Sequence, residues 1–252
     1  MIYVGVPAFN ERRTLGLLLW RVREILTELE RDFQMLVVDD ASTDGTSEVL
    51  EPYRRVLPLT VLKQPRRIGY SASVERLLRE AVKRSAYPKR DAFICMQGDF
   101  TDPPEAIPEM LKRFEGGIDL VTASSDRDDL CPRSVRFARK ASVVLARSLP
   151  TPPEISDPFR GYRLYRLFVL KRALGRAGDS RLLKHQGWAA NAELLMSVWP
   201  HVRQADELAT DPDYSRRFRR SRFRALPQLW SVFQASRDRR LRGLRLSSGG
   251  EA

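Results

Sequence analysis

The chain has 252 residues, of which 42% are hydrophobic and 30% are charged, and its net charge is +12. This length and balance fit a folded protein with one large domain, alone or with a small appendage. No apolar run reaches 18 residues and no signal-peptide pattern opens the chain, so we expect no membrane-spanning segment. Of the two cysteines, Cys95 lies in an apolar run and is expected in the core, which favours a reducing cytoplasm.

Apolar runs alternate with amphipathic stretches through the first half of the chain. This periodicity predicts strands at residues 2–6, 35–38, 59–62, 93–96 and 118–123. It predicts helices at residues 15–26, 46–50, 73–82 and 104–114. Because the strand runs are continuously apolar, we expect an α/β fold with a single, mostly parallel central sheet and helices on both faces.

The pattern changes after Ala123. We expect a polar loop at 124–132, a helix at 134–149, a turn and strand at 155–165, a helix at 188–199 and a strand at 202–209. A helix with a basic face is expected from Leu226, and residues 247–252 are expected to fray. The chain therefore divides into residues 1–210 and a basic helical C-terminal extension, 211–252.

Carboxylates follow several of the predicted strands. Glu11, Asp39, Asp40 and Asp99 each come just after a strand end, and the carboxyl ends of parallel strands gather at one edge, where α/β sheets bind ligands. A carboxylate such as Asp99, beside a glycine, could hold a divalent ion on a diphosphate. Asp102 precedes two prolines and a glutamate, a pattern typical of a helix N-cap, and capping is the simpler interpretation for it.

The positive charge is concentrated towards the C-terminus. Residues 215–224 interleave arginines with phenylalanines, and more arginines follow up to Arg245. Such a segment suits an anionic membrane surface or a polyanionic partner. Nucleic-acid binders show the same pattern. We expect no nucleic-acid partner, because carboxylates at the strand ends would repel phosphate without a metal.

Three segments, residues 4–11, 37–46 and 97–105, resemble motifs of the family 2 glycosyltransferases, which have the GT-A fold. Residues 157–163 (Asp-Pro-Phe-Arg-Gly-Tyr-Arg) are similar to a later motif of the dolichol-phosphate and polyprenyl-phosphate branch. The resemblance covers residues 1–225. It implies a catalytic domain at 1–210, with nucleotide-sugar binding in 1–125 and the acceptor side in 126–210. Residues 211–252 would face the acceptor or the membrane.

The resemblance also implies roles for single residues. Asp99 would bind Mg²⁺ or Mn²⁺ on the diphosphate of the donor, and Arg216 and Arg222 would reach the donor and acceptor phosphates. The implied base and ribose contacts are Pro7, Phe9, Glu11, Val38 and Asp40. Gln97, Gly98 and Arg127 complete the expected donor site.

The chain departs from the family pattern at two positions. The family usually has Asp-x-Asp at the metal site, whereas Gln97 stands at its first position. A neutral amide is a poorer Mg²⁺ ligand, so metal affinity would be low unless Asp102 joins the shell. Ser125 stands where relatives often have an arginine, and Arg127 could replace it from the same loop.

The acceptor side is less defined by sequence. A phosphate acceptor is already an anion and needs orientation, whereas a hydroxyl acceptor needs a carboxylate base within reach. Asp157 is the candidate for that carboxylate or for holding the acceptor; alternatively, it only forms the turn before Pro158. Glu193 matches a family position near the acceptor; alternatively, it is an exposed helix residue.

These features predict a metal-dependent, inverting transferase that moves a hexose from a GDP- or UDP-sugar to a polyprenyl phosphate. It would be cytoplasmic, with peripheral contact to the cytoplasmic face of an anionic membrane. One alternative is transfer to a soluble saccharide or natural-product hydroxyl. Another, of a different class, is a non-catalytic protein that binds nucleotide sugars or nucleic acid.

Overall fold

The computed structural model describes residues 1–125, 133–146, 149, 152–212 and 225–242. Its strands are β1 (Ile2–Ala8), β2 (Phe33–Asp39), β3 (Leu59–Lys63), β4 (Ala92–Cys95), β5 (Leu120–Ser124), β6 (Arg163–Arg166) and β7 (Ala205–Ala209). Its α-helices are α1 (Leu15–Glu28), α2 (Thr46–Arg54), α3 (Tyr70–Arg84), α4 (Ile107–Glu115), α5 (Arg133–Leu145), α6 (Leu167–Ala177), α7 (Trp188–Val198), α8 (Ala225–Arg237) and α9 (Arg239–Arg242). Short 3₁₀ turns, η1 (Pro104–Ala106) and η3 (Trp199–His201), precede α4 and follow α7.

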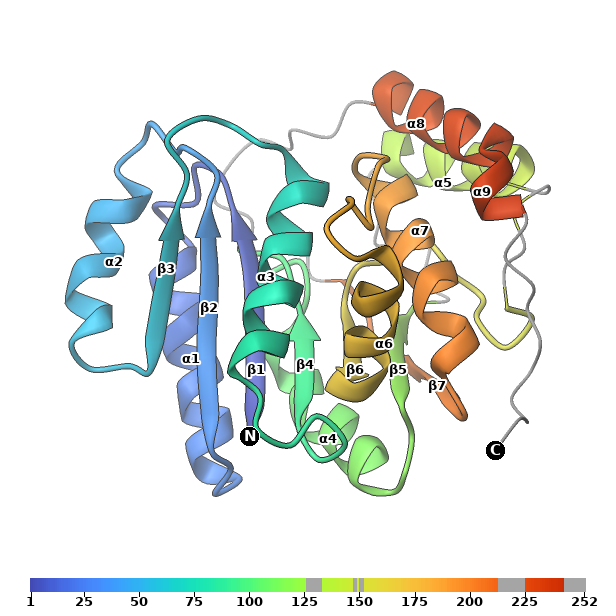
Figure 1. Ribbon diagram of the computed structural model, residues 1–252. Coiled ribbons are helices and arrows are strands. Elements are labelled where there is room, and N and C mark those ends of the chain that lie inside the picture. Colours follow the sequence, from blue (N-terminus) through green and yellow to red (C-terminus); the bar gives the residue numbers. More distant parts are fainter. Residues whose placement is uncertain (126–132, 147–148, 150–151, 213–224, 243–252) are drawn as a thin grey trace.

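The strands form one sheet in the order β3-β2-β1-β4-β6-β5-β7 (Figure 1). β1 pairs in parallel with both β2 and β4, β3 pairs in parallel with β2, and β5 pairs in parallel with β7. β6 runs antiparallel to both of its neighbours, β4 and β5. The predicted single, mostly parallel sheet is confirmed, with one antiparallel strand inside it.

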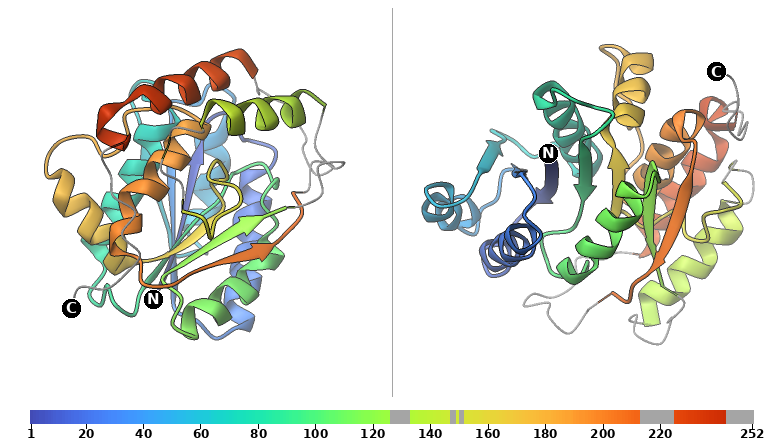
Figure 2. Two further views of the ribbon diagram at one scale, coloured as in Figure 1. Left: turned by 90° about the vertical axis from the view of Figure 1, so that its right-hand side faces the viewer. Right: turned by 90° about the horizontal axis from the view of Figure 1, so that it is seen from below.

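Helices cover both faces of this sheet, as predicted. Figure 2 (right) shows α3 and α6 on one side of the strands and α1 and α4 on the other. Alternate strand residues serve the two faces: Val4 and Val6 pack with α1, whereas Tyr3 packs with α3. Cys95 lies in the core on the α3 side, and burial raises the pKa of its thiol to about 12. The expectation of a buried cysteine is confirmed.

A third cluster of buried side chains lies between α7 and the helices that pack on it. It joins α5, α7, α8 and α9 through small and apolar residues such as Ala146, Met196, Val232 and Leu241. In Figure 1, α8 lies beside α5 and above α7. The described C-terminal helices therefore pack onto the second half of the chain. In the parts of the chain that the structure describes, no helix combines the length and the apolar character needed to cross a membrane.

Candidate active site

Three neighbouring strands end at one small polar pocket. β1 lies between β2 and β4, and the segments that follow these strands line a pocket of about 170 Å³. It is called the donor pocket hereafter, after the role that the resemblance implies for its residues. The residues singled out from the sequence that line it are Pro7, Phe9, Glu11, Asp40, Gln97, Gly98 and Asp99. The structure thus brings the strand-end carboxylates together at the edge where an α/β sheet binds ligands.

Of the two residues expected to contact the base at the end of β2, only Asp40 lines the donor pocket. Val38 is fully buried among core side chains on the α3 side, and it is not part of the pocket lining. Asp40 is buried at the pocket wall, where its Oδ1 accepts the N–H of Ile68 (2.5 Å) and its Oδ2 accepts that of Gly69 (2.9 Å). Asp40 therefore holds the loop before α3 in place over the pocket.

Arg67, which was not among the predicted site residues, forms part of the wall of the donor pocket. Its guanidinium carbon lies 4.0 Å from the centre of the Phe9 ring, and its Nε lies 3.9 Å from Oδ2 of Asp40. A guanidinium plane stacked on an aromatic ring forms a flat, cationic surface. The sequence showed that Arg67 lies in the loop after the third strand. It could not show the contact with Phe9, because the two residues are far apart in the chain.

The loop after β4 is held by its own carboxylates. Asp99 is buried, and its Oδ1 accepts hydrogen bonds from the backbone N–H of Thr101 (3.2 Å) and from its hydroxyl (2.6 Å). Asp102 accepts the backbone N–H of Gln97 at 2.9 Å. The expectation that Asp102 caps the next helix is wrong, because Pro103 is the N-cap residue of η1 and no side-chain cap bond forms there. The chain closes a loop on itself before the helix begins.

The donor set around Asp99 suits a metal ion that is shared with a ligand. Within the described ranges, no group of three or more His, Cys, Asp or Glu residues is arranged to hold a metal. Asp99 and Glu11 line the donor pocket together with the neutral Gln97. Mg²⁺ is commonly held by one or two carboxylates together with substrate phosphates, and these residues fit that arrangement.

A second pocket, of about 80 Å³, adjoins the first. It is called the acceptor pocket below, because the resemblance implies an acceptor at the 157–163 segment that lines it. Gln97 lines both pockets. The wall opposite Gln97 comes from the segment before β6 and from two helices. The residues of this wall that matter below are Arg139 of α5, Asp157, Arg160, and Trp188 and Asn191 of α7.

Asp157 forms the expected turn and also lines the acceptor pocket, and its role towards an acceptor stays a prediction. Its Oδ1 accepts the N–H of Phe159 (3.0 Å), as in a turn, while its Oδ2 is paired with Nη2 of Arg139 (2.8 Å) at the acceptor pocket. The arginine that ends the same motif, Arg163, is completely buried. It donates to Thr122 Oγ1, to the carbonyl of Asn191 and to the carbonyl of Pro158, at 2.7–2.8 Å. Arg163 therefore fixes the turn to the sheet and to α7.

The sequence pattern that defines the family described as glycosyl transferase family 2 matches residues 3–174 of this chain. The chain belongs to glycosyl transferase family 2. The match covers the lining of the donor pocket and the whole 157–163 turn, so the resemblance of the motifs to this family is confirmed.

Curated relatives of this family 2 chain include polyprenyl-phosphate sugar transferases. The chain is 28% identical over 175 residues to a dolichol-phosphate mannosyltransferase of Pyrococcus furiosus, covering 68% of this chain and 47% of that protein. It is 28% identical over 176 residues to an undecaprenyl-phosphate 4-deoxy-4-formamido-L-arabinose transferase of Pseudomonas fluorescens, covering 69% and 49%. The chain therefore spans about half the length of these relatives.

Solved structures with the same fold are glycosyltransferases as well. The glucosyl-3-phosphoglycerate synthase of Mycobacterium tuberculosis, solved with Mn²⁺, UDP-glucose and phosphoglyceric acid, superposes with a TM-score of 0.62 at 18% identity. The match covers 94% of this chain and 79% of the synthase. This likeness confirms the expected GT-A fold of the family 2 chain.

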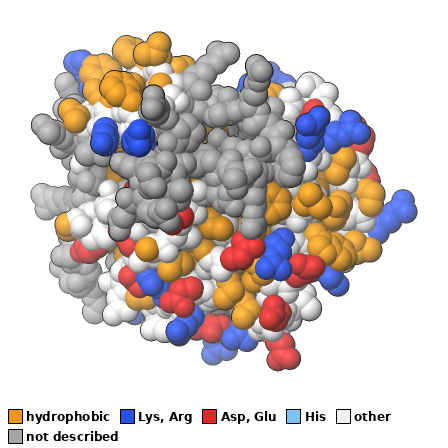
Figure 3. All heavy atoms as spheres, turned by 180° about the vertical axis from the view of Figure 1, so that it is seen from behind, with side chains coloured by type: hydrophobic (Ala, Val, Ile, Leu, Met, Phe, Trp, Pro, Cys, Tyr) orange, Lys and Arg blue, Asp and Glu red, His pale blue; other side chains and the backbone are white. Residues whose placement is uncertain are grey.

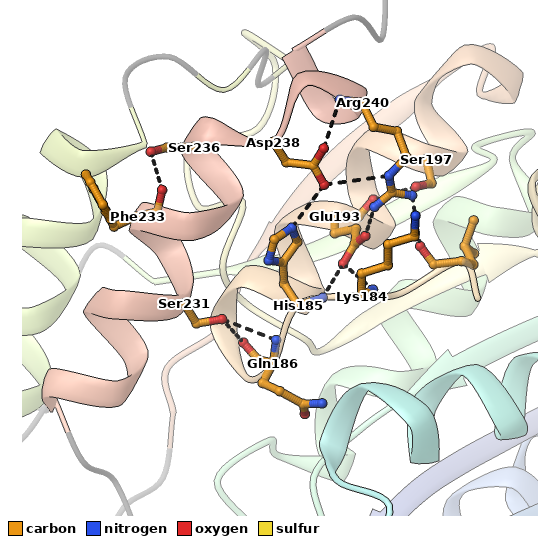
Figure 4. A network of polar contacts seen from close by, with 11 residues as sticks. Lys184, His185, Gln186, Glu193, Ser197, Ser231, Phe233, Ser236, Asp238 and Arg240 are labelled. Atoms are coloured by element: carbon orange, nitrogen blue, oxygen red, sulfur yellow. Dashed lines mark hydrogen bonds and ion pairs between the residues drawn. The ribbon is translucent and has the colours of Figure 1, made fainter. Parts of the chain in front are cut away.

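Glu193 is a buried anchor in this family 2 chain. Its carboxylate is completely buried, so the alternative of an exposed helix residue is wrong. Oε2 accepts the N–H groups of Lys184 and His185, each at 2.9 Å, and Oε1 is paired with Arg240 (Figure 4). Glu193 is not part of the acceptor-pocket lining; it joins α7 to α9 instead.

Arg127, Arg216 and Arg222 lie outside the described residues, so the place of Arg127 in the donor site and the phosphate contacts of Arg216 and Arg222 stay predictions. Ser125, which stands at the position where relatives often have an arginine, donates its hydroxyl to Oδ1 of Asp211 at 3.0 Å.

Proposed function

We propose that this protein transfers a hexose from a nucleoside-diphosphate sugar to the phosphate of a polyprenyl phosphate, with inversion at the anomeric carbon. One observation carries the proposal: the donor pocket at the strand ends shares Gln97 with a second pocket whose lining includes Arg139 and Arg160. The similarity to polyprenyl-phosphate transferases supports the class of acceptor.

The donor pocket offers complementary groups for the two ends of a nucleotide sugar. Phe9 and Arg67 present an aromatic and a planar cationic surface suited to a base, and Asp99 lies where a diphosphate would need charge compensation. We propose Mg²⁺ or Mn²⁺ at Asp99, supported by the Mn²⁺ and UDP-glucose bound to the mycobacterial synthase. Such an ion would supply Lewis-acid stabilisation to the leaving diphosphate.

The acceptor pocket favours a nucleophile that is already ionised. Asp157 is engaged by Arg139 and by the N–H of Phe159, which makes it a poor general base for a hydroxyl. A phosphate oxygen needs no such base. It would attack the anomeric carbon while the bond from that carbon to the diphosphate breaks, and the diphosphate would leave with the bonding electrons.

A surface beside the acceptor pocket supports contact with a membrane. α5 and α8 pack together and leave Phe137, Val144, Leu226 and Trp230 between 54% and 80% exposed. Seen from behind in Figure 3, hydrophobic side chains gather at the upper left, beside two Lys or Arg side chains. Apolar helix faces bordered by basic residues suit an anionic membrane surface. We propose that the α5–α8 face contacts the cytoplasmic side of the membrane.

Donor binding can be tested by thermal unfolding with a panel of GDP- and UDP-sugars, with and without Mn²⁺. Ligand at about 100 times its dissociation constant stabilises the folded state by about 2.7 kcal/mol. We expect one nucleotide class to raise the Tm more with Mn²⁺ than without it. Asp99→Asn should lose the Mn²⁺-dependent part of this rise and reduce sugar transfer to a polyprenyl phosphate on the order of 100-fold.

The matched control is Glu109→Gln, which removes an exposed carboxylate on α4. It should leave both donor binding and transfer unchanged. Unaltered Mn²⁺ dependence in Asp99→Asn would contradict the metal role. Donor binding without any sugar transfer to the lipid phosphate would count against the proposed acceptor.

A further inference from the structure

Arg160 lines the acceptor pocket, and part of its guanidinium has no hydrogen-bond partner in the described part of the protein. Its Nη1 donates to the carbonyl of Thr210 at 3.0 Å. Its Nη2 is buried and has no hydrogen-bond partner among the residues that the structure describes. Burying a charged donor without an acceptor costs free energy, which an oxygen of a ligand would recover.

The position of this guanidinium is fixed by the sheet. Thr210 follows β7 directly, and its N–H donates to the carbonyl of Ser124 at the end of β5 (2.7 Å). Arg160 is therefore anchored through Nη1 to the backbone at the edge of paired strands. A pre-positioned arginine loses little conformational entropy when its remaining N–H groups meet a ligand.

The other charged groups of the acceptor pocket are already engaged. Arg139 is paired with Asp157, and Asp102 accepts the backbone N–H of Gln97. Arg160, in contrast, has no ion pair within the described part of the chain. Among the described charged groups of this pocket, Arg160 is thus the cation that no carboxylate pairs with and that an anionic ligand could meet.

We infer that Arg160 recognises the phosphate of the acceptor and selects phosphomonoesters over alcohols. The inference rests on the proposed function. Arg160 lines the acceptor pocket, whereas Phe9, Arg67 and Asp99 line only the donor pocket. A phosphate at Arg160 therefore belongs to the acceptor. Guanidinium N–H groups bind phosphate oxygens through strong, charge-assisted hydrogen bonds.

The test compares Arg160→Gln and Arg160→Lys with the wild-type chain. Arg160→Gln keeps an N–H donor but removes the charge, and Arg160→Lys keeps the charge but loses the planar fork. Arg172→Gln is the matched control, because Arg172 is an exposed arginine stacked over Phe168 on α6, away from both pockets. The probes are a short prenyl phosphate and the corresponding prenyl alcohol, in binding and transfer assays.

We expect Arg160→Gln to weaken binding of the prenyl phosphate, and to raise its KM, on the order of 10- to 100-fold. Arg160→Lys should lie between this variant and the wild type. The alcohol, the donor Kd and donor hydrolysis without acceptor should each change less than about twofold, and Arg172→Gln should behave like the wild type. A merely structural role would instead move donor binding and phosphate binding together.

Two failures can be told apart. If the wild type binds the prenyl phosphate through Arg160 but transfers no sugar to it, the proposed function fails and the inference stands. If transfer occurs but both Arg160 variants bind the phosphate as the wild type does, the inference is overturned and the function stands. Equal loss of donor and phosphate binding in both variants, or no binding of the phosphate by the wild type, also overturns it.

Discussion

Gln97 stands between two sites that would each carry negative charge. Its side chain borders both pockets, and its backbone N–H is fixed by Asp102. A carboxylate at this position would strengthen a metal site but would also repel an anionic acceptor. The neutral amide removes that repulsion, and the expected consequence is weaker metal binding. Glutamine in place of the family's usual first aspartate therefore agrees with the proposal that a phosphate is the attacking group.

His201 should make folding stability depend on pH below neutrality. Burial, followed by the charges of Arg176 and Arg172, lowers the pKa of His201 below its ordinary value of 6.5. The unfolded chain therefore binds a proton more readily, and the free energy of unfolding should fall as the pH drops below about 6.5. Urea unfolding between pH 7.5 and pH 5.5 measures this slope. His201→Asn should flatten it; an identical slope in the variant would contradict the assignment.

At the level of single residues, sequence pattern located the site but not the bonds inside it. Asp99 and Asp40 could be placed at strand ends because the apolar runs before them are unambiguous. The bond of Asp102 could not be predicted, because Phe100 adopts a φ of +61° and turns the loop back towards Gln97. Such a conformation is rare for a bulky residue, so local preference pointed to a helix cap instead.

Among the elements, α7 holds the C-terminal helices through a small polar network (Figure 4). Asp238 joins the His185 ring (3.2 Å) to the start of α9, and Ser231 on α8 bonds the backbone of Gln186. Burial disfavours the charged form of Asp238, but hydrogen bonds from Arg240 and His185 outweigh it and lower its pKa. The centre of this network is the ion pair between the fully buried Glu193 and the partly exposed Arg240.

Arg240→Ala should destabilise the protein by about 2–3 kcal/mol, because it leaves the fully buried Glu193 carboxylate without its cation. Urea unfolding at neutral pH measures the change. Arg90→Ala, which removes an exposed arginine just before the amino end of the central strand β4, should cost less than about 0.5 kcal/mol. A loss in Arg240→Ala no larger than in this control would show that the pair does not hold α9.

The helix α6 and the direction of β6 were not predicted, each for a physical reason. The helix α6 was not predicted, because it begins at Leu167, directly after the last residue of β6, and no turn residue separates the two. β6 was expected within residues 155–165, but its direction was not, because side-chain alternation is the same in parallel and antiparallel strands. The strands of the first half had apolar runs and turn residues, and each of them is confirmed.

At the scale of the whole molecule, both pockets lie at the carboxyl end of β4, and α5 contributes both to the lining of the acceptor pocket and to the α5–α8 face. This layout would present the sugar donor to a lipid phosphate held at the membrane surface. The packing of α8 on α5 could not be predicted from sequence. Its contacts are made by small residues such as Ala235 and by residues nearly a hundred positions away, for which local periodicity carries no signal.

The membrane contact is tested by co-sedimentation with vesicles that contain anionic phospholipid. Replacing Leu226 and Trp230 together with serine should reduce binding at least about tenfold, because each large apolar side chain contributes roughly 1.5–3 kcal/mol when it is buried in lipid. Tyr87→Ser is the control. Tyr87 is 68% exposed, but it precedes the amino end of β4, whereas both pockets lie at the carboxyl end of that strand. Equal binding by the double variant and the wild type would move the contact away from this face.

The reversed strand decides which groups can meet. In β6, Arg163 pairs with Cys95, so the chain enters this strand beside the point where β4 ends. The segment carrying Asp157 and Arg160 therefore arrives next to Gln97. If β6 ran the other way, its entrance would lie about 13 Å distant, at the opposite rim, four residues at roughly 3.3 Å each. The antiparallel direction of β6 thus places its first residue beside the last residue of β4, and gives the two pockets a common border at Gln97.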